Sequence, residues 1–426
     1  MNASADTDGG APRAGLRRVV HQIDALELGS ETRLEDGRLT VSAEEAEGIL
    51  EDAALADVTV SCVSPGESAR IVKVLDAVEP RAKPDGGGVF PGFLAPIRSA
   101  GVGETHVLRG AAVVAAGHLP RAQEAVVEMA GAGAELSPLG GTHNLVVGFE
   151  RAGDADWEDV DAALRRGLLE LAARLAEAAL EAEPDAVEEL PPPALERGER
   201  PRVVAVTNLQ TQGAFKDVFV YGRSMAGSLP TLVDPGELED GAVVSGQYGH
   251  PGLKNPTYLH QNHPIAAALR ASGEAELGGV ILCPEPTDHH AKERVSALAA
   301  RLCLTCGFDA AIVTKEGGGN ADADVALKMD ALEELGIPAV GLFAEMGGPE
   351  GTAPPLVVAP TKATAMVSTG NYDELIELGE VERVLGGERI DVRDADAHEA
   401  VELPHAAIYG ALNPLGWGRL TCEEAT

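Results

Sequence analysis

The stretch Val203-Val-Ala-Val-Thr-Asn-Leu-Gln-Thr-Gln212 begins as a short apolar run and ends in amide and hydroxyl side chains. Four similar apolar runs follow, separated by segments with helical patterning, at residues 279–283, 310–314, 339–343 and 363–367. Near-continuous apolar strands that alternate with helices are typical of a parallel sheet covered on both faces. We therefore expect residues 201–426 to form a doubly wound, mainly parallel α/β domain.

The chain before these runs has a different pattern. Residues 1–150 contain short β-type runs, such as residues 57–62, between glycine-rich turns, and this predicts a β-rich N-terminal domain. Residues 156–183 are rich in alanine and leucine at helical spacing, and residues 188–193 hold two glutamates, a leucine and three prolines. Residues 151–200 are therefore predicted to be a long helix followed by a stiff, acidic linker.

The composition excludes some classes of function. The chain has 426 residues, and 68 Asp and Glu against 33 Lys and Arg give a net charge of −35, which repels nucleic acid and anionic membranes. The first ten residues are polar and acidic, so we expect no signal peptide, and no apolar run is long enough to span a bilayer. The predicted protein is soluble and cytoplasmic.

The loops that follow the predicted strands are the first place to search for a site. In parallel α/β sheets, ligands bind beyond the carboxyl ends of the strands, where these loops converge. The loops at residues 315–324 and 344–348 then bring Glu316, Asn320 and Glu345 towards one crevice. Asp322 and Asp324 are expected to cap the helix that follows.

A second candidate site is the loop at residues 245–264, which is dense in Gly, Pro, His and amide side chains. Three of the eleven histidines, His250, His260 and His263, lie within it. Glycines and prolines fix a backbone path, while imidazoles and carboxamides supply hydrogen-bonding and proton-transfer groups that a connector does not need. With Glu316 or Glu345 these histidines would also offer metal ligands, but their spacing fits no standard metal motif, so we expect no metal.

Several segments carry a family resemblance over most of the chain. The sequence resembles the component B proproteins of glycine, sarcosine and betaine reductases, and more distantly the D-proline reductase proprotein. The resemblance rests on Ser64-Pro-Gly-Glu-Ser-Ala-Arg-Ile71, Val78-Glu-Pro-Arg81, Gly88-Val-Phe-Pro-Gly92, Gly131-Ala-Gly-Ala-Glu135, Asp240-Gly-Ala-Val-Val-Ser-Gly246, Lys254-Asn-Pro-Thr-Tyr258 and Glu316-Gly-Gly-Gly-Asn320.

The resemblance implies a cofactor that this chain lacks the residue to make. In that family the proprotein cuts itself at a cysteine just after the Val-Ser-Gly run, and the new N-terminus becomes a pyruvoyl group that captures the substrate amine. Here Tyr248 stands in that place, and a tyrosine has no β-leaving group. Ser245 lies three residues upstream and is a much weaker candidate for such a cleavage. The chain is therefore predicted to stay uncleaved and to have no pyruvoyl cofactor.

The predicted function follows from the resemblance and from this departure. The chain is expected to be a subunit of a reductase-like complex that acts on a small nitrogenous compound beside a partner subunit bearing a thiol or selenol. Tyr248, His250 and His260 are the predicted catalytic residues. The predicted substrate-binding residues are Tyr258, Gln261, Asn262, His263, Glu316, Asn320 and Glu345.

Two other functions stay open at this point. A stand-alone or metal-assisted lyase or hydrolase would use the same pocket without a thiol partner. A non-catalytic subunit would only stabilise its partner in a hetero-oligomer, although the loop at residues 245–264 has more polar groups than a scaffold requires.

Overall fold

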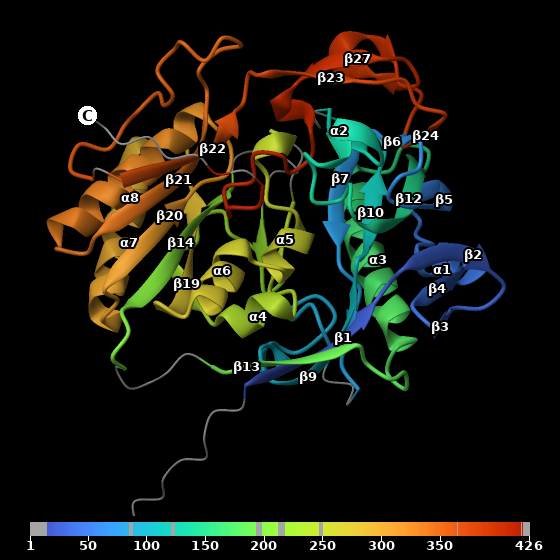
Figure 1. Ribbon diagram of the computed structural model, residues 1–426, viewed down its shortest axis with the longest axis horizontal. Helices are drawn as coiled ribbons and strands as arrows, with labels where there is room; N and C mark the ends of the chain where they lie inside the picture. The colour runs from blue at the N-terminus through green and yellow to red at the C-terminus, as the bar shows by residue number, and fades with distance from the viewer. Residues whose placement is uncertain are drawn as a thin grey trace, which may run out of the picture.

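The structure is a computed structural model that describes residues 15–84, 88–120, 124–192, 198–211, 218–246, 250–363, 365–418 and 420. It is a mixed α/β fold with several sheets, which confirms the predicted class (Figure 1). Among the described helices, none is long and apolar enough to cross a membrane.

The largest sheet has six strands in the order β17-β19-β14-β20-β21-β22. Five of them run parallel, and the edge strand β17 (Thr231–Val233) runs antiparallel to its neighbour. The parallel strands coincide with the five apolar runs in the sequence: β14 (Arg202–Gln210), β19 (Glu276–Glu285), β20 (Ala310–Thr314), β21 (Ala339–Glu345) and β22 (Ala365–Asn371).

Helices cover both faces of this sheet. Alternate residues of a strand point to opposite faces, so Val204 and Val206 of β14 pack in the core beneath α7 (His289–Cys306) and α8 (Asp322–Glu334). Ala205 packs on the other face, under α4 (Pro235–Glu239) and α6 (Pro264–Ser272). A strand with both faces buried must be apolar throughout, which explains the continuous runs.

The first half of the chain forms smaller sheets around one long helix (Figure 1). That helix, α3 (Trp157–Glu177), was predicted, and its leucines enter the core between the sheets. One sheet has the order β5-β12-β10-β7 and another the order β13-β1-β9-β8. Their strands are β5 (Leu55–Val63), β12 (His143–Arg151), β10 (Ala111–Ala116), β7 (Val74–Val78), β13 (Ala186–Leu190), β1 (Leu16–Gln22), β9 (Gly103–Arg109) and β8 (Arg81–Ala82).

Short elements complete the fold. The short strands are β2 (Ala25–Gly29), β3 (Arg33–Glu35), β4 (Arg38–Ser42), β6 (Ala69–Ile71), β11 (Val127–Glu128), β15 (Phe219–Val220), β16 (Arg223–Ser224), β18 (Val243–Val244), β23 (Leu375–Leu378), β24 (Arg383–Leu385), β25 (Arg389–Ile390), β26 (Ala395–Asp396) and β27 (Val401–Pro404). The short helices are α1 (Ala43–Ile49), α2 (Gly131–Ala134), α5 (Thr257–Gln261), η1 (Ile97–Ser99), η2 (Pro251–Leu253), η3 (Gly319–Ala321), η4 (Asp391–Arg393) and η5 (His405–Ala407).

Two segments tie the halves of the chain together. Part of the predicted linker is a strand, because β13 pairs antiparallel with β1 and its polar backbone groups find partners there. Near the C-terminus, β24 pairs in parallel with β6, and Ile408 bridges to Val126. The predicted domain limits at about residues 150 and 200 stay a prediction.

A buried carboxylate joins α4 to the strands of the first half. The side chain of Glu239 is 2% exposed and lies 2.6 Å from Arg18, 3.0 Å from Arg81 and 3.1 Å from Arg270. Burial by itself would raise the pKa of Glu239, but the three guanidinium groups hold that pKa below its usual value. Glu239 is therefore charged at neutral pH and holds three cations in place.

We expect Glu239→Gln to lower the free energy of unfolding by about 3–5 kcal/mol, because three guanidinium groups lose their shared buried anion. Since the folded-state pKa is depressed, this stabilisation is present at neutral pH and is lost as the pH falls through that pKa. Urea unfolding followed by circular dichroism measures both effects. Glu170→Gln is the control, because Glu170 forms only an exposed pair with Arg166, and equal small losses in the two variants would contradict this role.

Candidate functional site

The strand order locates a crevice. Among the parallel strands, β14 comes first in the chain and lies between β19 and β20 in the sheet. In the chain, β19 is the next parallel strand and β20 follows it. The loops after β14 and β20 therefore lead in opposite directions, and in open α/β sheets ligands bind at such a topological switch point. The crevice lies beyond Gln210 and Thr314.

The chain fills the centre of this crevice with its own side chains. Glu316 is fully buried, and its carboxylate accepts hydrogen bonds from the backbone N–H groups of Gln210, at 2.8 Å, and Asn255, at 2.9 Å. The Lys254 ammonium lies 3.6 Å from the same carboxylate, and burial lowers the pKa of Lys254. Glu316, predicted to bind substrate, thus joins the loops after β14 and β20 to the loop at residues 250–256.

Three further lysines are buried behind the crevice. Lys292, Lys315 and Lys328 are each at most 1% exposed. Lys315 pairs with Asp322, and Lys292 and Lys328 pair with Asp324. A buried ammonium group is tolerated only beside an anion, and this sets the position of both aspartates.

The predicted capping role of the two aspartates is wrong. The N-cap of α8 is Ala321, and no side chain caps it. Asp322 and Asp324 lie in the first turn of α8 and are fully buried. One oxygen of Asp322 also accepts a hydrogen bond from the backbone N–H of Val357, at 2.8 Å. Their carboxylates neutralise lysines and fasten a neighbouring loop.

The carboxyl group of Glu285 belongs to the same cluster. Burial, together with the nearby carboxylates of Asp324 and Glu316, raises the pKa of Glu285 well above its usual value. Glu285 ends β19 and accepts a hydrogen bond from the backbone N–H of Glu316, at 3.0 Å. The floor of the crevice therefore holds a carboxyl group with a raised pKa beside ion pairs.

The loop at residues 245–264 begins at a buried anchor. The backbone N–H of Ser245 donates to the Thr257 hydroxyl at 2.8 Å, and that hydroxyl donates to Asp76 at 2.6 Å. Burial raises the pKa of Asp76 to about 7, against the effect of the Thr257 hydrogen bonds. The hydroxyl of Ser245 is buried and has no hydrogen-bond partner in the part of the chain that the structure describes.

His250 is the predicted catalytic residue that reaches the edge of the crevice. Its backbone has φ 53° and ψ 59°, the left-handed conformation, just before η2. Its Nδ1 lies 2.9 Å from the Tyr372 hydroxyl, and burial raises the pKa of that phenol, which is therefore protonated at neutral pH. Tyr372 follows β22 and donates its backbone N–H to the carbonyl of Glu345, at 2.8 Å.

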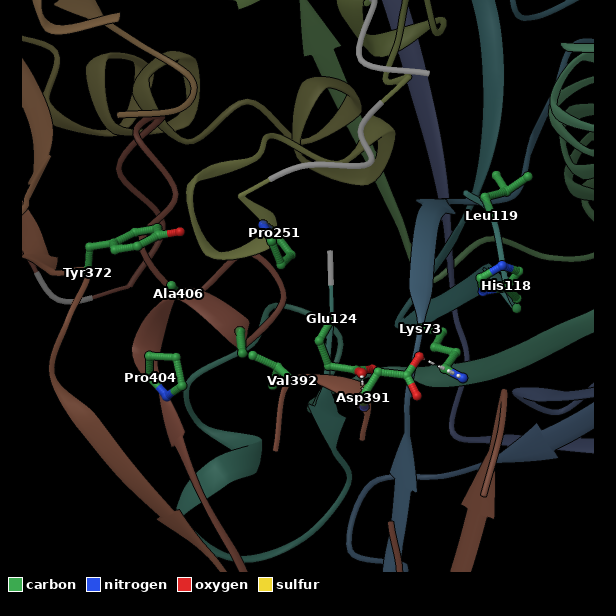
Figure 2. A pocket seen from close by; sticks show the side chains of 12 residues that line it. Lys73, His118, Leu119, Glu124, Pro251, Tyr372, Asp391, Val392, Pro404 and Ala406 are labelled. Atoms are coloured by element: carbon green, nitrogen blue, oxygen red, sulfur yellow. Dashed lines mark hydrogen bonds and ion pairs between the residues drawn. The ribbon is translucent and has the colours of Figure 1, made fainter. Parts of the chain in front are cut away.

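A cavity of about 430 Å³ opens beside Tyr372 (Figure 2). Figure 2 shows Tyr372 on one side of it, with the hydroxyl directed towards Pro251, and Lys73, Glu124 and Asp391 together on the other side. The cavity lies between the first half of the chain and residues 391–407. Its lining residues are Lys73, Gly117, His118, Leu119, Glu124, Pro251, Tyr372, Asp391, Val392, Pro404, Ala406 and Ala407.

The charged side of the cavity has two carboxyl groups and one ammonium group. Lys73 lies 3.2 Å from Asp391, and the backbone N–H of Asp391 donates to one oxygen of Glu124, at 2.7 Å. Within the described part of the chain, the other oxygen of Glu124 is buried without a hydrogen-bond partner, and burial raises the pKa of this carboxyl. Two carboxyl groups beside one ammonium favour a ligand with a cationic nitrogen, which would also bind to that oxygen.

The predicted residues on and after α5 lie elsewhere. Gln261 accepts a hydrogen bond from the backbone N–H of Glu79, at 2.9 Å, and donates to its carbonyl, at 3.2 Å. Asn262 accepts one from Arg81, at 3.1 Å. These amides hold α5 against the strands of the first half, and neither residue lines the cavity beside Tyr372.

The two histidines of this segment are buried, and Tyr258 is half-buried. Tyr258 packs against the core of the first half. His263 is the N-cap of α6, where its Nδ1 accepts from the backbone N–H of Ala266, and burial lowers its pKa to about 4. Burial, with His263 and Lys254 nearby, lowers the pKa of His260 well below its usual value, and among the described residues neither ring nitrogen of His260 has a hydrogen-bond partner. Both imidazoles are neutral at pH 7.

Three other predicted features need a separate statement. Tyr248 lies outside the described residues. Asn320 is exposed in η3, and Glu345 is half-buried at the end of β21. Within the described part of the chain, no group of three or more His, Cys, Asp or Glu side chains is placed to hold a metal ion.

The structure adds cavity residues that sequence reasoning missed. Lys73, Glu124, Tyr372 and Asp391 come from segments up to about 320 residues apart, and none of them lies in a motif. Only the position of Tyr372 was a usable signal, because it lies shortly after the predicted strand run at residues 363–367 and directly after the observed strand β22.

Comparisons with known proteins agree on one family. A family model described as glycine/sarcosine/betaine reductase component B subunits matches residues 16–423. The glycine reductase complex component B subunits alpha and beta of Peptoclostridium acidaminophilum are 35% identical over 419 residues, which cover 94% of this chain and 97% of that protein. The betaine reductase complex component B subunit alpha of the same organism is 32% identical over 434 residues, which cover 94% and 98%.

The more distant resemblance is also confirmed. The D-proline reductase proprotein of Acetoanaerobium sticklandii is 23% identical over 364 residues, which cover 77% of this chain and 54% of that protein. No solved structure matches the chain. The family match extends over both halves of the fold, including the crevice and the cavity, and the chain belongs to the glycine/sarcosine/betaine reductase component B family.

Proposed function

We propose that this chain is the substrate-binding subunit of a reductase complex, and that it holds a small nitrogenous compound in the cavity beside Tyr372. The observation that carries the proposal is the wall with the two carboxyl groups of Glu124 and Asp391, opposite the Tyr372–His250 pair. The relatives are subunits of reductase complexes, by name, for glycine, sarcosine and betaine. Each of these compounds carries a positively charged nitrogen, which suits such a wall.

The proposed chemistry needs a thiol or selenol from a partner subunit. The sulfur or selenium attacks the carbon next to the cationic nitrogen, a new bond forms to that carbon, and the C–N bond breaks. The nitrogen leaves as a neutral amine with the electron pair of that bond. A thiol must first lose its proton, and the Nε2 of His250 accepts it while Nδ1–H donates to the Tyr372 oxygen.

We further propose that no pyruvoyl group takes part. Tyr248 offers no leaving group on its β-carbon, so it does not fit the chemistry that would make one. Among the described residues, the hydroxyl of Ser245 has no hydrogen-bond partner, and a serine needs an adjacent base to become a nucleophile. The side chains described above must therefore hold the substrate without help from a cofactor made from the backbone.

We expect the purified protein to be a single uncleaved chain of 44.0 kDa by intact mass spectrometry. Treatment with borohydride or a hydrazine should leave the mass unchanged, because no reactive carbonyl is present. Ser245→Ala is the matched variant and should give the same result, apart from the mass of the substitution. Two fragments from the parent chain, with none from Ser245→Ala, would show that Ser245 is a processing site.

The second test concerns the negative wall. Glu124→Gln should weaken binding of the best ligand among glycine, sarcosine and betaine by about tenfold or more, because one charge-assisted contact is lost. Isothermal titration calorimetry measures the affinity. Glu181→Gln, an exposed change outside the cavity, is the control and should bind as the parent does. Equal affinity in both variants would place the nitrogen site elsewhere.

The third test separates catalysis from binding. His250→Gln should lower turnover by the complete complex by a factor of about 10²–10⁴, the range for a general base, with ligand affinity little changed. Tyr372→Phe should lower it by about 10² or less, because it removes only the group that orients the imidazole. His290→Gln, exposed on α7, is the control. Full turnover by His250→Gln would exclude it as the base, and turnover without any thiol partner would favour a lyase or hydrolase.

A further inference from the structure

A second large cavity lies at the opposite end of the six-stranded sheet. Its volume is about 470 Å³, and its lining includes residues at the beginning of β14 and β19 and at the end of β13. Figure 1 shows where these strands lie. Three of its lining residues are arginines, Arg200, Arg202 and Arg270, which come from the start of β14 and from α6. This cavity shares no lining residue with the cavity beside Tyr372.

The guanidinium group of Arg202 is held in a fixed orientation. It lies over the ring of Phe308, 5.3 Å from the centroid, and one of its nitrogens donates to the carbonyl of Cys306, at 3.2 Å. Among the described residues, no carboxylate pairs with this half-buried side chain. A guanidinium group has five N–H donors, so several of those on Arg202 remain for a ligand.

The other two arginines also keep donors. Arg200 donates to the carbonyl of Gly273, at 3.2 Å, and to Glu276, at 2.9 Å. Arg270 donates to Glu239, at 3.1 Å, and that carboxylate is shared with two other guanidinium groups. Arg200 and Arg270 thus each have a carboxylate partner, and each has further N–H donors beyond these bonds.

The net charge of the lining residues is opposite in sign to the net charge of the whole chain. Three arginines stand against Glu189 and Glu276 in the lining, while the chain carries a net charge of −35. At physiological salt the distant negative charges are screened beyond about 8 Å, so the local guanidinium groups decide what binds. Leu190, Leu269 and Leu277 add apolar surface to the same cavity.

We propose that this cavity binds a small organic anion, with a phosphate or carboxylate group on the arginines and an apolar body against the leucines. Planar guanidinium groups suit both oxyanions, because each can accept two parallel N–H bonds. The site is separate from the proposed substrate cavity and serves a ligand of the opposite charge.

Isothermal titration calorimetry of the full chain with phenyl phosphate, benzoate and inorganic phosphate tests the proposal. We expect phenyl phosphate or benzoate to bind saturably, and more tightly than inorganic phosphate, which has no apolar body. Arg202→Gln and Arg200→Gln should each weaken that binding by about tenfold or more. Arg301→Gln, which is exposed on α7 outside the cavity, is the matched control and should bind as the parent does.

Two further measurements keep the result unambiguous. First, circular dichroism and thermal unfolding without ligand show whether Arg202→Gln and Arg200→Gln fold as the parent does. If one of the two misfolds, the affinity of the other decides. Glu124→Gln, in the other cavity, should not affect phenyl phosphate binding. No saturable binding of either organic anion, equal affinity in the arginine variants and Arg301→Gln, or loss of affinity in Glu124→Gln would each overturn the proposal.

Discussion

The buried carboxylate of Glu316 is the constraint on which the site depends. It accepts backbone N–H groups from the end of β14 and from the loop at residues 250–256, and it lies beside the buried ammonium of Lys254. A charge with no access to water must have all its partners in place, so these three segments are fixed relative to one another. His250 begins the loop at residues 250–256, and its position against Tyr372 follows from that attachment. The ion pair of Glu316 and Lys254 at the centre of the crevice thus helps to fix the position of His250 at its edge.

Much of this fold could be predicted from the sequence, because burial on two faces leaves a strong signal. Each parallel strand of the large sheet must be apolar at every position, and the five runs between residues 203 and 367 show this directly. The location of the crevice follows from the strand ends, and Glu316 and His250 were found there. The strand β13 was missed, because two glutamates followed by prolines are typical of a linker and only the partner β1 makes the segment a strand.

The rest could not be predicted, for physical reasons that differ between residues. Asp322 and Asp324 have the sequence position of helix caps, yet they neutralise buried lysines, and one of these, Lys292, reaches Asp324 only through the packing of α7 on α8. The amides of Gln261 and Asn262 suit a substrate pocket equally well, but they bond to Glu79 and Arg81 from another part of the chain. The cavity beside Tyr372 combines residues from segments that only the tertiary fold brings together. Long-range pairing of this kind leaves no local pattern in the sequence.

The two cavities of this acidic chain are lined by charged groups of opposite sign. The cavity at the carboxyl side of the sheet has an excess of carboxylates, and the cavity at the amino side has an excess of guanidinium groups. A cationic nitrogen and an organic anion would therefore be sorted to opposite ends of one sheet before any finer recognition acts. Arg270 belongs both to the buried network of Glu239 and to the lining of the second cavity, so one group that stabilises the fold also contributes to the charge of that cavity. These charges come from ordinary side chains of the two linings, so the proposed binding does not depend on whether a cofactor forms at Ser245 or Tyr248.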